Sequence, residues 1–195
     1  VTDAAGNFIF QGKFTSIIPV SSSQPEEDFD KDLQKYLREG YTASSESIGV
    51  RGRAIGFVMA IYRKLAASSI AAIERALTRR LQRLENGDLA ESSIDEEQVD
   101  ERFVGEWEES VDGPAEQFFD GEISMLKVLI SKALLLFSKD NKLQTFLDEL
   151  VATILQNNSR EKILIFTEYR GTQDYLAEAL QKRFGQQSVS LLHGG

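Results

Sequence analysis

The chain has 195 residues, 42% of them hydrophobic, and carries a formal net charge of −9. This length allows one or two domains, and the absence of cysteine excludes disulfides and thiolate metal sites. The single histidine, His193, is too little for a histidine metal centre or a Ser-His-Asp triad. A cytoplasmic location is expected, because the sequence shows neither a signal-peptide pattern nor an apolar run of membrane-spanning length.

The negative charge is concentrated in one segment. Residues 85–122 contain 15 acidic residues and one basic residue, a local charge of −14, so the rest of the chain carries +5 (−9 minus −14). This composition predicts a solvated acidic linker, and its aromatic residues are the expected anchor points for packing: Phe103, Trp107, Phe118 and Phe119. The mildly basic remainder keeps nucleic acid among the allowed partners.

The N-terminal part predicts an extended segment followed by a helix. Residues 8–20 are rich in β-branched and aromatic side chains and end near a proline, as in a short strand or an extended connection. Ser23 and Glu26 have the spacing of a capping box, so a helix is expected to begin there. Gly40 predicts its end, and residues 42–52 predict a small polar loop.

The next segment predicts one long helix from Ala54 to Glu85. Its apolar residues recur at three- and four-residue steps and form one stripe: Val58, Tyr62, Leu65, Ile73, Leu77, Leu81 and Leu84. Such a helix would be roughly 45 Å long and would project from the domain. The stripe itself predicts packing against other helices.

The same helix carries arginines away from the stripe. Arg75, Arg79 and Arg83 lie four residues apart, and Arg80 stands beside them. These side chains have two interpretations, a basic face that tracks phosphates or an ordinary solvated face paired with nearby glutamates.

The C-terminal part predicts two helices, over 123–137 and 143–154, and then a β-α-β unit. Residues 162–167 predict a buried strand, Thr172 predicts the cap of a helix that ends at Gly185, and 188–193 predict a second, parallel strand. The carboxyl ends of the two strands would meet at one edge, where Arg170 and nearby glycines suit a phosphate. The sequence contains no Gly-x-x-x-x-Gly-Lys-Ser/Thr loop and no dinucleotide-binding turn.

The stretch "EKILIFTEYRGTQDYLAEALQKRF", followed by "LLHGG", resembles the start of the second RecA-like lobe of superfamily 2 helicases. It is most similar to bacterial Swi/Snf-type DNA translocases related to the RNA-polymerase-associated ATPase. The segment "GFVMAIYRKLAASSIAAIERALTRRLQRL" resembles the helical insertion of that group. The resemblance covers nearly the whole chain, but the acidic segment at 85–122 contributes nothing to it.

The resemblance implies a mostly α fold with a C-terminal partial α/β unit. Residues 1–121 would hold the inter-lobe connection, the helical insertion and the acidic linker, and 122–195 would open lobe two. It implies that the chain is a fragment of an ATP-dependent helicase or translocase. The intact protein would use ATP and Mg²⁺, and this fragment would contain no catalytic or metal-binding residue. The partner would be nucleic acid, DNA favoured over RNA, with a protein partner on the helical insertion. The residues implied in nucleic-acid contact are Thr167, Tyr169, Arg170, Gly171, Thr172, His193 and Gly194.

A second hypothesis belongs to a different class. The chain would be a non-enzymatic helical interaction module with a small α/β cap, recruiting a partner protein through the long helix.

Overall fold

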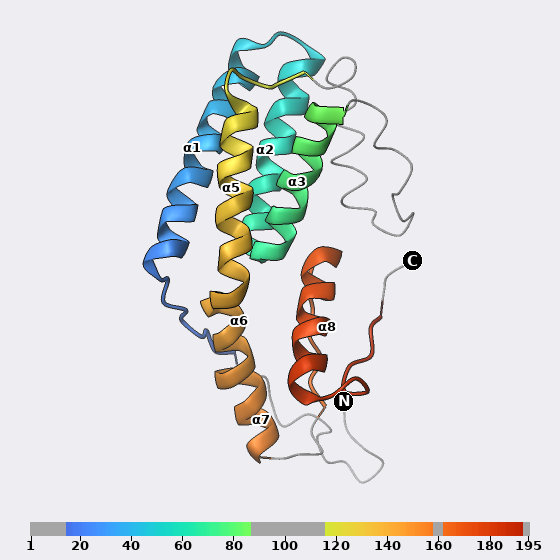
Figure 1. Cartoon of the computed structure of the whole chain (residues 1–195). Helices are drawn as coiled ribbons and strands as arrows, with labels where there is room; N and C mark the ends of the chain where they lie inside the picture. Colours follow the sequence, from blue (N-terminus) through green and yellow to red (C-terminus); the bar gives the residue numbers. More distant parts are fainter. Residues whose placement is uncertain (1–14, 87–115, 158–161, 193–195) are drawn as a thin grey trace.

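A computed structural model describes residues 15–86, 116–157 and 162–192. Within these ranges the chain is mostly α-helical and contains no strand, which confirms the predicted mostly α class. Figure 1 shows the helices α1 (Gln24–Glu46), α2 (Val50–Ser68), α3 (Ile70–Asn86) and α5 (Glu122–Leu136) side by side and running alternately up and down, with α8 (Arg170–Phe184) below α3. This arrangement is an antiparallel four-helix bundle.

Helix α1 (Gln24–Glu46) begins at the predicted capping box. The backbone N–H of Ser23 donates to the Glu26 carboxylate at 2.6 Å, and the box is complete in both directions. The prediction that the helix ends at Gly40 is wrong. Gly40 is buried inside α1, where an added Cβ would collide with the side chain of Met59, so this glycine allows a close helix contact rather than a stop.

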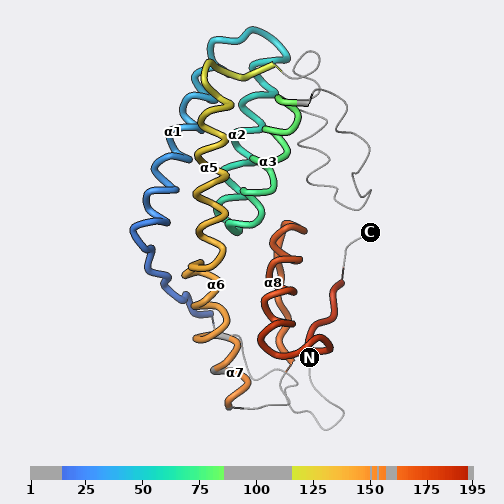
Figure 2. Tube along the Cα trace, viewed as in Figure 1, coloured from blue at the N-terminus to red at the C-terminus, as the bar shows by residue number. Residues whose placement is uncertain are grey.

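The predicted helix from Ala54 to Glu85 is in fact two helices. Helix α2 (Val50–Ser68) and helix α3 (Ile70–Asn86) are separated by Ser69, which has an extended backbone with φ −157° and ψ 158°. The two lie side by side in Figure 2 instead of projecting as one rod. The apolar stripe turns inward from both halves, and Tyr62, Ile73 and Leu77 are fully buried.

Helix α5 (Glu122–Leu136) completes the bundle by packing against both α1 and α3. Its Leu126 and Leu129 join the buried side chains of the other three helices in one core cluster. The packing therefore groups α5 with the preceding helices. The exposed side chains of α5 include Leu135, which is 74% accessible.

A buried charge pair ties α3 to α5. Glu122, which the sequence places in a solvated acidic segment, is fully buried, and its carboxylate accepts from Nε and Nη2 of Arg80, each at 3.0 Å. Tyr36 donates its hydroxyl to the same carboxylate at 2.9 Å. The guanidinium of Arg80 also stacks 3.6 Å from the ring centre of Phe118, so this predicted anchor is confirmed. Phe103 and Trp107 lie outside the described residues.

The chain beyond α5 continues through a short 3₁₀ turn, η2 (Phe137–Lys139), into a second helical stretch. This stretch consists of α6 (Asn141–Thr145), the π-helical turn η3 (Phe146–Val151) and α7 (Ala152–Asn157). The carboxylate of Asp140 caps it by accepting from the backbone N–H of Leu143 at 2.9 Å.

Helix α8 (Arg170–Phe184) ends at Gly185, whose φ of 103° suits glycine. The predicted strands on either side of it are not formed. Residues 162–167 and 188–192 run without regular secondary structure, and Leu164, Phe166 and Leu192 are 71%, 87% and 82% exposed. Parallel strands need ladder partners on a covered sheet. Two strands that follow each other in sequence can be separated in a sheet by a third strand that pairs with both. No such strand is found among the described residues.

Candidate functional site

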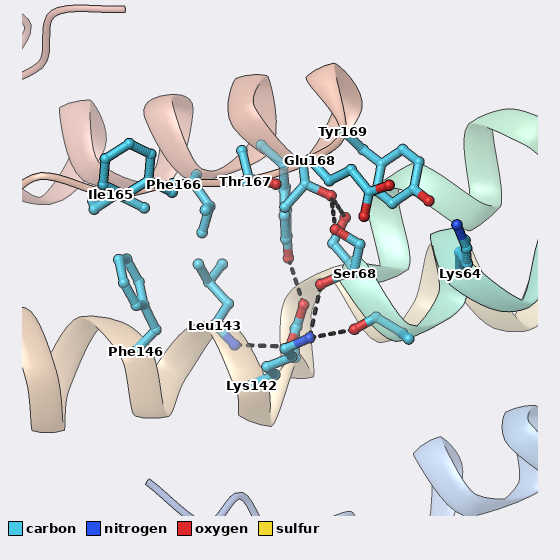
Figure 3. A pocket seen from close by; sticks show the side chains of 16 residues that line it. Lys64, Ser68, Lys142, Leu143, Phe146, Ile165, Phe166, Thr167, Glu168 and Tyr169 are labelled. Atoms are coloured by element: carbon cyan, nitrogen blue, oxygen red, sulfur yellow. Dashed lines mark hydrogen bonds between the residues drawn. The ribbon is translucent and has the colours of Figure 1, made fainter. Parts of the chain in front are cut away.

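A cavity of about 560 Å³ opens where the lower end of the bundle meets α8. Its walls come from the end of α2, the start of the α6 stretch and residues 165–169. Figure 3 shows Leu143 and Phe146 on one wall, facing the segment that carries Ile165 and Phe166. Polar groups gather towards Ser68, so the cavity has an apolar part and a polar part.

Lys142 closes the polar part from the α6 side. Its ammonium donates to the carbonyl oxygens of Ala67 and Ser68, at 2.6 and 2.8 Å. These carbonyls belong to the last turn of α2, where acceptors lack helical partners and a positive charge is favourable. Lys142 therefore acts as a C-terminal cap of α2.

Three hydroxyl groups join α8 to the break between α2 and α3. Oγ1 of Thr172 lies 2.7 Å from Oγ of Ser68 and 2.8 Å from Oγ of Ser69. Ser69 also caps α3, because its Oγ accepts from the backbone N–H of Ala72 at 3.1 Å. The prediction that Thr172 caps α8 is wrong, since the helix begins earlier, with Tyr169 at the cap position. Thr172 is buried inside the first turn instead.

A tyrosine and an aspartate form the remaining polar contact of the wall. The hydroxyl of Tyr175 donates to Oδ2 of Asp140 at 3.1 Å. Burial raises the pKa of Tyr175, and the negative charge of Asp140 raises it further. The phenol therefore stays protonated at neutral pH and serves as a hydrogen-bond donor.

The residues predicted to contact nucleic acid differ in how far their side chains are exposed. Thr167 is half-buried on the cavity wall, and Arg170 is half-buried in the first turn of α8. Tyr169, Gly171 and Thr172 are buried, and Tyr169 belongs to the bundle core.

The described part of the predicted second strand, residues 188–192, also approaches α8. The side-chain amide of Gln173 donates to the carbonyl of Leu192 at 3.0 Å, so Leu192 lies beside the first turns of α8. His193 and Gly194 follow directly but lie outside the described residues.

The arginines of α3 do not form a uniform basic face. Arg75 pairs with Asp174 of α8 at 3.6 Å, Arg79 and Arg83 are half-buried, and Arg80 lies in the buried pair with Glu122. Sequence reasoning did not single out Lys64, which lines the cavity from α2. Its position in an amphipathic helix carries no motif that would have identified it.

The described parts of the chain contain no cluster of three or more potential metal-binding histidine, cysteine, aspartate or glutamate side chains. Among the helices in those parts, none is long and apolar enough to cross a membrane. Comparison with family models, with curated proteins and with solved structures gave no match for this chain.

Proposed function

We propose that this chain is part of an ATP-driven nucleic-acid translocase of the Swi/Snf type, located in the cytoplasm. Its role is to contact nucleic acid and to couple the two RecA-like lobes. The family assignment is supported by the likeness of residues 160–195 to the opening of lobe two. The observation that carries the coupling role is the hydroxyl contact between Thr172 and the α2–α3 break.

The coupling follows from where that contact lies. Thr172 stands in the first turn of α8, two residues after Arg170, while Ser68 and Ser69 form the corner of the bundle. If α8 moves relative to the bundle, these hydrogen bonds either break or pull Ser68 and Ser69 along with Thr172. The bundle thus senses the position of the segment that would touch nucleic acid.

The C-terminal unit would complete an α/β sheet in the working motor. The exposed apolar residues at 162–167 and 188–192 are suited to strands once neighbouring strands and helices cover them. ATP and Mg²⁺ would be bound by the intact protein's lobes, where hydrolysis depends on positioning and charge stabilisation. This chain would contribute no catalytic group.

The hypothesis of an interaction module that docks through the long helix is weaker. The apolar stripe proposed as the docking face is the bundle core, with Val58 and Tyr62 fully buried. A partner could reach it only after the bundle opened.

The test uses the full-length protein that contains this chain. We expect DNA to stimulate its ATP hydrolysis, and Arg170→Ala to weaken DNA binding and to reduce the slope of log affinity against log salt by about 1. Lys182→Ala, in the last turn of the same helix, is the matched control and should change neither. A protein without DNA-stimulated hydrolysis, or without a Gly-Lys-Thr loop in its sequence, would refute the proposal.

A further inference from the structure

The helical stretch below the bundle changes its hydrogen-bond register part of the way along. The backbone N–H of Phe146 donates to the carbonyl of Lys142, four residues earlier, as in an α-helix. The backbone N–H of Ala152 donates to the carbonyl of Leu147, five residues earlier, at the end of η3 (Phe146–Val151). Such π-helical turns are rare, and they occur mostly as single turns within α-helices, frequently at functional sites. The turn η3 therefore accommodates one residue more than an α-helix would.

The part of the stretch before η3 is fixed to the bundle. The backbone N–H of Asn141 donates to Oε1 of Glu26 at 3.0 Å, and its side-chain amide donates to Oε2 at 2.9 Å. The ammonium of Lys142 donates to the carbonyl oxygens of Ala67 and Ser68. Two helices of the bundle, α1 and α2, thus hold the beginning of α6.

The turn η3 itself is fixed to α8. Leu147 and Val151 are buried and share one apolar cluster with Leu180 of α8. Asp148 pairs with Arg183 of the same helix at 2.9 Å. These contacts lie in the C-terminal half of α8, away from its hydroxyl contact with the bundle. The irregular turn thus follows a part held by the bundle and is itself held by α8.

We propose that η3 is a hinge that changes between the π-helical and the α-helical form when α8 moves relative to the bundle. This inference rests on the proposed function, because it names the element through which the coupling of the two lobes passes. If α8 carries Leu147 and Val151 with it while Asn141 stays in place, the chain between them must turn. Each residue of an α-helix turns the chain by roughly 100°, so a register change in η3 rotates the residues that follow it.

Deletion of one residue should fix this hinge. Phe146 and Val151 are five residues apart, which is about one π-helical turn. Without Glu149, an exposed residue between them, the spacing is four, which keeps both residues on one face of an α-helix. The deletion therefore preserves the apolar face of the stretch and removes the residue that η3 accommodates. Glu149→Ala is the matched control, because it removes the same carboxylate and keeps the chain length.

The experiment uses the full-length protein that contains this chain. Its affinity for duplex DNA is measured by fluorescence anisotropy with and without a non-hydrolysable ATP analogue. In the wild type and in Glu149→Ala, we expect the analogue to change this affinity by about 5- to 150-fold, the usual size of an allosteric coupling. In the protein without Glu149 we expect a factor of about 1, with the affinity for DNA alone unchanged.

Hydrogen exchange tests the hinge without nucleic acid. In the wild type, the amide of Ala152 should exchange faster than that of Leu129 in α5, because its bond to Leu147 breaks whenever η3 changes form. Exchange at Ala152 should slow in the protein without Glu149 and stay at the wild-type rate in Glu149→Ala. A wild-type rate at Ala152 as slow as that at Leu129 would overturn the inference, even if the deletion variant failed to fold.

The hinge and the translocase proposal fail in different ways. A wild type without DNA-stimulated hydrolysis refutes the translocase, and the exchange at Ala152 still decides whether η3 is a hinge. If DNA stimulates hydrolysis but the protein without Glu149 retains the wild-type coupling factor, the translocase proposal stands and the hinge fails. The hinge also fails if the analogue leaves the DNA affinity of such a wild type unchanged.

Discussion

Glu122 illustrates how much one side chain contributes at the residue scale. Its carboxylate receives donors from Arg80 and Tyr36 and from the backbone N–H of Phe118, at 2.6 Å. Burial raises the pKa of Tyr36 well above its usual range, and the negative charge of Glu122 adds to this effect. Tyr36 is therefore a neutral donor, and Arg80 supplies the charge that makes a buried carboxylate tolerable.

Removal of that charge should destabilise the bundle strongly. Arg80→Met leaves the Glu122 carboxylate buried without a counter-charge, and we expect the free energy of unfolding to fall by about 3–5 kcal/mol in urea denaturation. Arg63→Met, at an exposed position of α2, should have almost no effect. The double variant Arg80→Met/Glu122→Gln should recover part of the loss, and an Arg80→Met protein as stable as the wild type would disprove this account.

At the scale of elements, the break between α2 and α3 determines the fold. A continuous helix would carry its second half away from the bundle, whereas the break folds Ile73 and Leu77 back into the core. Ser69 stabilises the break from within by capping α3. Lys142 and Thr172 stabilise it from elements far along the chain.

The cap can be tested by removing one oxygen atom. Ser69→Ala should lower the free energy of unfolding by about 0.5–2 kcal/mol. Hydrogen exchange at the Ala72 amide should become faster, because that N–H loses its acceptor. Ser131→Ala, on the exposed side of α5, serves as the control, and unchanged exchange at Ala72 would contradict the assignment of the cap.

Local signals in the sequence predicted local structure well. The Ser23–Glu26 box and the glycine at 185 depend on neighbours within four residues, so pattern alone located the start of α1 and the end of α8. The break at Ser69 was missed because the apolar stripe keeps its helical period through it. Its stabilising partner Thr172 stands 103 residues away.

The candidate site was less predictable than the helices. The sequence indicated the loop with Thr167 and Arg170, because motif and position agreed there. It could not indicate that Lys64 and Phe146 face this loop, because that arrangement depends on how the bundle packs against α8. Interpretations that treat every charged residue as solvated fail in the same way for Glu122, which is fully buried.

At the scale of the whole molecule, Glu26 connects the bundle to the helical stretch below it. Its Oε2 belongs to the capping box of α1, while its Oε1 accepts from the backbone N–H of Asn141 at 3.0 Å. One carboxylate thus caps two helices, and Glu26 stands 115 residues before Asn141, the first residue of the second helix. Partial burial raises the pKa of Glu26, but hydrogen bonds from Ser23 and Asn141 outweigh it, and the pKa lies below its ordinary value of 4.5.

This shift makes stability depend on pH in a definite direction. Because the folded pKa is lowered, the contribution of Glu26 is complete above the unfolded pKa and is lost as pH falls through the folded value. We expect the free energy of unfolding to fall more steeply between about pH 5 and pH 3 in the wild type than in Glu26→Gln. Glu27→Gln, the exposed neighbour, should retain the wild-type slope; equal slopes in all three proteins would contradict the prediction.

The pairing of Arg80 with Glu122 also constrains the order in which the bundle can assemble during translation. Arg80 emerges 42 residues before the carboxylate that neutralises it. Helices α1, α2 and α3 can therefore associate early, but the site for the guanidinium stays incomplete while the acidic segment is being translated. The fourth helix brings the missing charge with its first residue and the missing apolar face with the residues that follow, such as Leu126 and Leu129. Closure of the core thus waits for the synthesis of α5, which opens with the partner of Arg80.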